Sequence, residues 1–115
     1  MAVYAHPGRL LRRELAARGL SANRLALDIG VPSGRITDIL NARRSISADT
    51  AVRLGRYFGN NVAFSGQVGT GWPKKTRHIR IAQFWLDLQG QYDIAAVVRE
   101  RGKEITRRVR PADAA

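Results

Sequence analysis

The chain has 115 residues, of which 44% are apolar, so it can form one small domain with a buried core. Lysine and arginine number 20 against 9 acids, a net charge of +11 that favours a polyanionic partner, either nucleic acid or an anionic membrane surface. The lack of cysteine excludes disulfides and thiolate metal sites. No apolar run approaches the ~18 residues needed to span a bilayer, and no signal peptide is visible, so we expect a cytoplasmic protein that binds nucleic acid and no membrane.

The first predicted helix runs from about Gly8 to Arg18. Pro7 precedes it and suits the first helical position, because the amide hydrogen that proline lacks would have no partner there. Leu11 and Leu15, four residues apart, supply its apolar side, and Gly19 is well placed to end it. Its other positions are interpreted as a solvated face formed by Arg9, Arg12, Arg13 and Arg18.

Two short helices joined by a tight turn are predicted between Ser21 and Leu40. Ser21 is expected to be the N-cap of the first, since its hydroxyl can accept a bond from a free amide. Gly30 can adopt the left-handed conformation that ends this helix, Pro32 stops its continuation, and Ser33 is expected to cap the second helix. Apolar residues at helical spacing predict the packed faces of a helix-turn-helix: Leu25, Ala26, Ile29, Ile36, Ile39 and Leu40.

The second of these helices is the candidate for contacting DNA bases. At Gly34 the backbone can approach DNA closely, and the amides of a helix N-terminus suit a phosphate. Arg35 can pair with a phosphate or a guanine edge, and Thr37 can contact a thymine methyl group or a phosphate. Asp38 can accept from a cytosine amino group or hold Arg35 in place, and we favour the second role. If Ile36 points inward, helical rotation places Gly34, Asp38 and Asn41 on the outward face. The same rotation places Arg35 and Thr37 on its flanks.

Two adjacent arginines, Arg43 and Arg44, follow this helix and are predicted to bind phosphates. Cations here also complement the dipole at the helix C-terminus. A fourth helix is predicted from its N-cap, Ser47, to Gly59. Its expected core face consists of Ala51, Leu54 and Phe58.

Residues 60–81 are a basic insertion without acids, for which we expect an irregular loop or a small hairpin. A helix in its first half is disfavoured by Gly66, Gly69, Gly71 and Pro73. Its second half, Lys74 to Ile81, can instead extend the next helix backwards. Trp72 can stack on a base or pack on the domain.

A fifth helix is predicted over residues 82–102, ending at Gly102, followed by a short basic tail at 103–115. Trp85, Leu88 and Tyr92 form one stripe along it, either part of the core or the seam of a dimer. We therefore divide the chain into a helix-turn-helix core at 7–59, the insertion at 60–81, this helix and the tail.

These features resemble the Cro/C1-type helix-turn-helix (XRE) family, and more narrowly the HigA-type antitoxins of the VapI group. Three blocks show the resemblance: HPGRLLRREL, GLSANRLALDIGVPSGRITDILNARRSISADTAVRLGRYFGN and FWLDLQGQYD. The resemblance implies an all-α, five-helix lambda-repressor-like domain that binds a palindromic operator as a homodimer. It also implies neutralisation of a RelE- or HigB-like mRNA endonuclease toxin and autorepression of the operon. The candidate DNA-binding residues are Ser21, Ser33, Gly34, Arg35, Thr37, Asp38, Asn41, Arg43 and Arg44.

Two features depart from that pattern. The insertion stands where the family has only a few residues, and the tail is basic where the family tends to be acidic. An acidic tail would suit a basic toxin, so the basic tail favours the alternative of a plain dimeric phage-type or housekeeping transcriptional repressor. A third option is general, charge-driven binding of nucleic acid, which ignores sequence and weakens steeply with salt.

No catalytic, metal or cofactor site is predicted. His6 and His78 lie far apart in the sequence, without a carboxylate at ligand spacing, and are interpreted as exposed surface residues. No phosphate-binding loop, acid pair or nucleophile arrangement is evident. We therefore expect a binding protein and not an enzyme.

Overall fold

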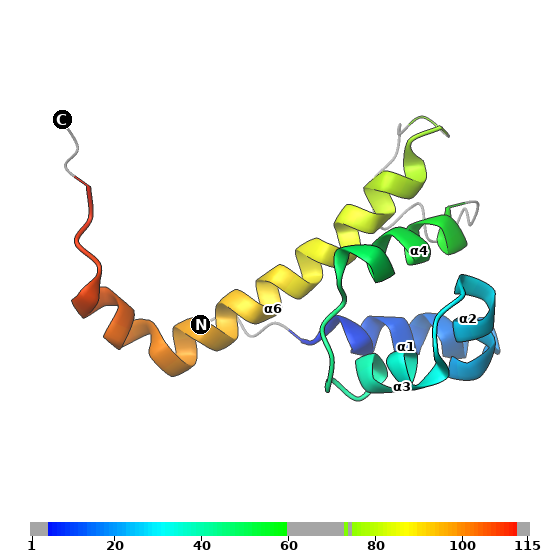
Figure 1. Ribbon diagram of the computed structural model, residues 1–115, viewed down its shortest axis with the longest axis horizontal. Coiled ribbons are helices and arrows are strands. Elements are labelled where there is room, and N and C mark those ends of the chain that lie inside the picture. Colours follow the sequence, from blue (N-terminus) through cyan, green and yellow to red (C-terminus); the bar gives the residue numbers. More distant parts are fainter. Residues whose placement is uncertain (1–4, 60–72, 74, 113–115) are drawn as a thin grey trace.

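The computed structural model describes residues 5–59, 73 and 75–112. Within them the chain is all-α, as predicted, with five helices and no strand (Figure 1). The helices are α1 (Pro7–Ala17), α2 (Ala22–Ile29), α3 (Ser33–Leu40), α4 (Ala48–Phe58) and α6 (Arg77–Arg108). In this part of the chain no helix is both long and apolar enough to cross a membrane.

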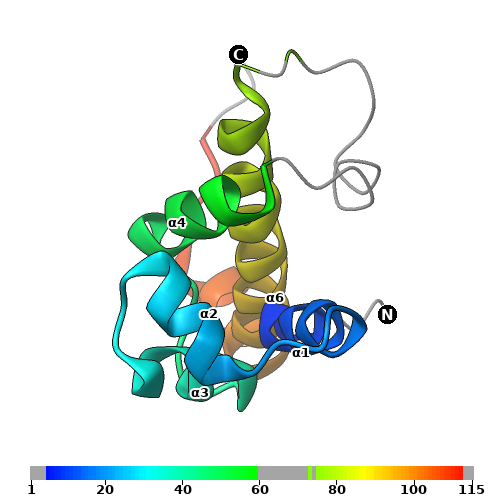
Figure 2. The same ribbon diagram turned by 90° about the vertical axis from the view of Figure 1, so that its right-hand side faces the viewer.

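The first half of α6 is the support on which the shorter helices assemble. Figures 1 and 2 show α1 to α4 gathered along it, while its second half projects away from them. Trp85 of α6 is fully buried, and its ring centroid lies 6.3 Å from that of Phe58 on α4. The predicted apolar faces of α1 to α4 meet around these two rings, because Leu11, Leu25, Ile36 and other residues of those faces are buried in the same core.

Two glycines allow close helix contacts. A Cβ atom on Gly8 would collide with the carbonyl oxygen of Ile39, and one on Gly55 would collide with the carbonyl oxygen of His78. Gly8 therefore sets the approach of α1 to the end of α3, and Gly55 sets the approach of α4 to α6.

Most of the predicted helix ends are confirmed. The Ser21 hydroxyl accepts a bond from the Arg24 amide at 3.0 Å, and Gly30 is left-handed, with a φ of +74°. Ser47 caps α4, and Gly59 ends it. The prediction that Ser33 caps α3 is wrong: Pro32 is the N-cap residue, without a side-chain bond, and Ser33 is already the first helical residue.

The bounds of α6 differ from those predicted. The helix begins at Arg77, so the second half of the insertion extends it backwards from Ile81, and it continues past Gly102 to Arg108. A single helical glycine costs only about 1 kcal/mol. Here the Thr106 hydroxyl donates to the Gly102 carbonyl at 2.8 Å, and Glu104 pairs with arginines on both sides. The earlier part of the insertion, with Trp72, lies outside the described residues, and the division of the chain into functional parts stays a prediction.

The prediction of exposed histidines is wrong. His6 is 7% exposed and caps α1, its Nδ1 accepting the Gly8 amide at 2.9 Å. Its ring meets the Tyr92 ring of α6 edge-on at 5.0 Å, and burial lowers the pKa of His6. His78 is half-buried on α6. The His6 ring thus contacts a residue distant in the sequence, and His78 lies where α6 packs against Gly55 of α4.

Candidate nucleic-acid interface

The outward face of α3 is formed in part as the helical rotation predicts: Gly34 and Asn41 are exposed, whereas Asp38 is half-buried. Ile36 and Ile39 are completely buried, which turns Ser33, Gly34 and Thr37 outward, where all three are exposed. The Thr37 hydroxyl donates to the Ser33 carbonyl at 3.2 Å, so its orientation is fixed by the helix backbone.

The N-terminus of α3 is open to solvent. Its N-cap makes no side-chain bond, and the first turn holds no acid, so the local positive potential is not offset there. A Cβ atom on Gly34 would meet nothing within 4 Å. Ser21, the exposed N-cap residue of α2, accepts the Arg24 amide through its hydroxyl. The backbone at Gly34 is therefore accessible to an anion from outside.

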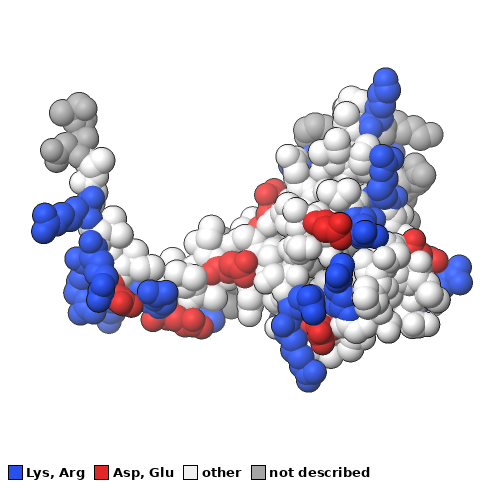
Figure 3. Space-filling view, in the orientation of Figure 1, with Lys and Arg blue, Asp and Glu red and all other residues white. Residues whose placement is uncertain are grey.

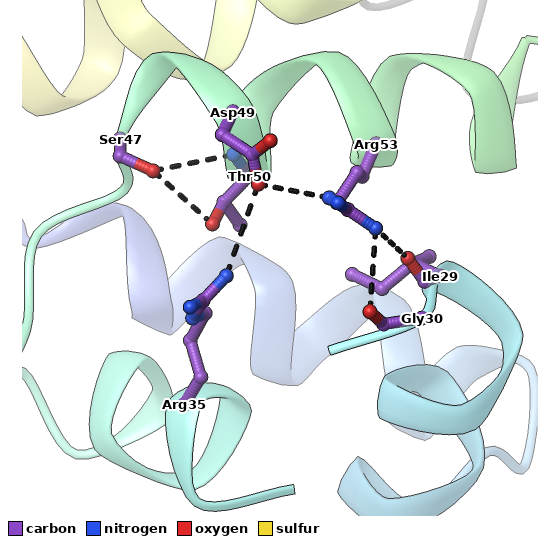
Figure 4. A network of polar contacts seen from close by, with 7 residues as sticks. All are labelled: Ile29, Gly30, Arg35, Ser47, Asp49, Thr50 and Arg53. Carbon is purple, nitrogen blue, oxygen red and sulfur yellow. Dashed lines mark hydrogen bonds and ion pairs between the residues drawn. The ribbon is translucent and has the colours of Figure 1, made fainter. Parts of the chain in front are cut away.

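The prediction that Asp38 holds Arg35 is wrong. Arg35 points toward the first turn of α4, where its Nη1 lies 3.8 Å from Oδ2 of Asp49 (Figure 4). Asp38 instead lies 3.9 Å from Nε of Arg44. Asp38 thus pairs with an arginine of the following loop. Arg35 pairs instead with Asp49, which lies 14 residues further along the chain.

The loop after α3 displays both predicted arginines. Arg43 and Arg44 are exposed, and Figure 3 shows basic side chains gathered over this loop. Two features define the backbone conformation of this loop. Ala42 is left-handed, with a φ of +58°, and the Arg43 amide donates to the Asp38 carbonyl at 2.8 Å. The two guanidinium groups therefore stand on a fixed turn beside the face of α3.

Asn41 is exposed, but its side chain is engaged from α1. Arg12 donates through Nη2 to Oδ1 of Asn41 at 3.0 Å and to the Leu40 carbonyl at 3.3 Å. Arg18, also expected on a solvated face, pairs with Glu14 and lies 5.0 Å from the Phe58 ring centroid. Part of the predicted solvated face thus supports the fold and the end of α3.

The arrangement suits recognition of a polyanion. It combines an open helix N-terminus, one arginine held at a defined position, and two exposed arginines on a neighbouring turn. Within the described residues, no group of three or more histidine, aspartate or glutamate side chains could hold a metal ion. Sequence reasoning found the exposed residues of this surface but missed the Asp49 and Arg12 contacts, because both depend on how separate helices pack.

Comparison with known proteins agrees with this fold. The helix-turn-helix family matches residues 11–64. Virulence-associated protein I of Dichelobacter nodosus is 37% identical over 97 residues, covering 84% of this chain and 71% of that protein.

Two solved structures are similar over almost their whole length. An addiction module antidote protein of the HigA family from Coxiella burnetii has a TM-score of 0.73 and 37% identity, over 96% of this chain and 100% of that one. The Pseudomonas aeruginosa antitoxin HigA with the higBA promoter has a TM-score of 0.72 and 34% identity, over 95% and 98% of the two chains. The chain therefore belongs to the Cro/C1-type helix-turn-helix (XRE) family, in its HigA-type, or VapI, group.

Proposed function

We propose that the chain is a sequence-specific DNA-binding antitoxin that acts as a homodimer in the cytoplasm, represses its own operon and neutralises a RelE- or HigB-like toxin. The observation that supports it most is the outward face of α3 beside the Arg43–Arg44 turn. The similar Pseudomonas antitoxin was solved with promoter DNA, which supports the same use of the fold in this chain.

Affinity and sequence preference come from different residues of this surface. Arg43 and Arg44 bind phosphates, together with the amides near Gly34, and these contacts position the protein without identifying a sequence. Arg35 and Thr37 contact base edges in the major groove. Further phosphate contacts come from Ser21, Ser33 and Asn41, while Asp38 orients Arg44 from α3.

This separation between residues that provide affinity and residues that provide sequence preference can be tested with matched arginine substitutions. Replacing Arg43 and Arg44 with alanine should weaken binding to every duplex alike and flatten the slope of log affinity against log salt by about one unit per lost phosphate contact. Replacing Arg107 and Arg108 removes the same charge from the far end of α6 and should leave that slope unchanged. Equal slopes for both double variants and the parent would show that the α3 turn does not bind phosphate.

Dimerisation is assigned to the projecting half of α6. Ile94, Val97 and Val98 are 66%, 44% and 57% exposed, and Ile105 continues their face at helical spacing. Such a contiguous apolar face, on the half of a helix that projects away from α1 to α4, is typical of an interface. Two copies joined here would present two α3 helices to a palindromic operator, with half-sites about one helical turn apart.

Sedimentation measurements test this proposed dimer interface. Replacing Ile94 and Val98 with glutamate should give monomers that bind a single half-site weakly. Leu27→Glu adds a similar charge at a residue that is 68% exposed on α2 and should leave the dimer intact. A dimer that persists in the double variant would place the interface elsewhere.

The toxin partner is tested by co-expression with the product of the neighbouring gene. The antitoxin function predicts that an adjacent small basic protein stops growth alone and that this chain restores growth. The alternative, a plain repressor, is favoured by the basic end of α6, where Lys103, Arg107 and Arg108 outnumber the acids and would repel a basic toxin. A neighbouring gene product that is harmless, or harmful despite this chain, would favour that alternative.

A further inference from the structure

Asp49 stands at the centre of a polar network that joins α3 to α4. Its Oδ2 accepts a bond from Nε of Arg53 at 2.8 Å and lies 3.8 Å from Nη1 of Arg35 (Figure 4). The three residues come from two helices, and Arg35 reaches from α3 toward the first turn of α4. A single carboxylate oxygen thus faces two guanidinium groups.

Arg53 anchors that carboxylate to the turn of the helix-turn-helix. Its Nη1 donates to the carbonyl of Ile29 at 2.8 Å and to that of Gly30 at 3.3 Å, both at the end of α2. Asp49 is further fixed by its place in the first turn of α4, where the Ser47 hydroxyl caps the Thr50 amide. The carboxylate therefore has a defined position relative to both helices of the motif.

We propose that Asp49 is a positioning residue that restricts Arg35 to a base contact in the DNA complex. One end of the guanidinium faces the carboxylate, which leaves the Nη2 and Nε donors for a bidentate contact with a guanine edge. The paired arginine also attracts phosphates less than a free one, so the pair favours sequence-dependent over general binding. This inference rests on the proposed function, because it requires α3 to contact DNA.

A purely structural role for Asp49 makes a different prediction. As an acid in the first turn of α4 and a partner of Arg53 at i+4, Asp49 would contribute only to stability. Its replacement would then lower the melting temperature and raise affinity for all duplexes equally, since one negative charge is lost. The ratio of affinities between a preferred and an altered duplex would stay constant.

The test is a double-mutant cycle in which the measured quantity is the ratio of affinities between the preferred and an altered duplex. The parent protein first selects its preferred duplex from a randomised library. Affinities are then measured for this duplex and for single base-pair changes, with the parent, Asp49→Asn, Arg35→Ala and the double variant. Asp28→Asn is the matched control, because Asp28 pairs with Arg24 at i−4 on α2 and does not touch Arg35.

At the base pair where Arg35→Ala loses its preference, Asp49→Asn should lower the affinity ratio about fivefold, and binding to unrelated duplexes should strengthen. In the Arg35→Ala background, the same substitution should leave the ratio unchanged. Asp28→Asn should leave it unchanged in both backgrounds.

The inference is overturned if Asp49→Asn keeps the parent ratio while Arg35→Ala reduces it, and the proposed contact of Arg35 then still stands. It is equally overturned if Asp49→Asn lowers the ratio in the Arg35→Ala background. If Arg35→Ala itself leaves every ratio unchanged, the assignment of Arg35 to a base contact fails together with the inference.

Discussion

Replacing Gly34 with alanine should change stability and DNA affinity in opposite directions. The new Cβ atom would meet nothing within 4 Å, so the free protein has no clash to accommodate. Alanine is the better helix former by about 1 kcal/mol in a helix interior, and we expect about half of that at the second residue of α3. The melting temperature should therefore rise by about 3 °C.

The same methyl group should hinder the DNA complex. If the α3 backbone approaches a phosphate at this residue, the added carbon stands between them, and we expect about a tenfold loss of affinity, which equals about 1.4 kcal/mol. Urea denaturation and fluorescence anisotropy with the selected duplex measure the two effects separately. Gly90→Ala, which also introduces a Cβ into open space but on α6, should stabilise the protein without changing affinity. A Gly34→Ala variant that is more stable and binds DNA as the parent does would refute close approach at this residue.

Three further predictions concern stability and can be checked by urea denaturation. Gly55→Ala should destabilise the fold by about 1–3 kcal/mol, because its Cβ would force α4 away from the His78 carbonyl of α6, and an unchanged midpoint would contradict this packing. Ala42→Gly should stabilise by about 1 kcal/mol, because alanine is strained at its φ of +58°, and a loss of stability would show that no strain is present. Burial lowers the pKa of His6 below its ordinary 6.5, so the unfolded chain binds this proton more readily than the folded chain does. The free energy of unfolding should therefore be highest above pH 6.5 and decrease as the pH falls below it. His6→Asn keeps a capping acceptor and should flatten that pH dependence, and an equally steep dependence in this variant would assign it to other groups.

The local signals of the helix-turn-helix were sufficient to predict its elements. Ser21 and Gly30 act at the ends of α2 through bonds and conformations that depend only on neighbouring residues, so their roles follow from spacing. The apolar residues of α1 to α4 recur at helical intervals and are buried as expected. Gly34 and Asn41 of α3 are exposed as the same rotation predicts, while Asp38 is half-buried.

The remaining features depend on side-chain pairs within α6 or on contacts between distant segments. Gly102 indicates a helix end by itself, but the pairs formed by Glu104 and the bond from Thr106 let α6 continue past it. His6 is buried because Tyr92 on α6 covers it, and neither residue's neighbours in the sequence indicate this. Arg35 has an acid three residues away, yet it pairs with Asp49, because the packing of the helices brings the first turn of α4 within ion-pair distance of its side chain.

Sequence-specific DNA binding can be tested by comparing two duplexes. The affinity of the parent protein is measured at physiological salt for a duplex from the region upstream of its own gene and for a scrambled duplex of equal length and composition. We expect a preference of about a thousandfold or more for the upstream duplex, which the protein should protect at two half-sites about one helical turn apart. Equal affinity for both duplexes, lost in parallel as salt rises, would show that the net charge of +11 drives general binding and that the protein does not recognise a sequence.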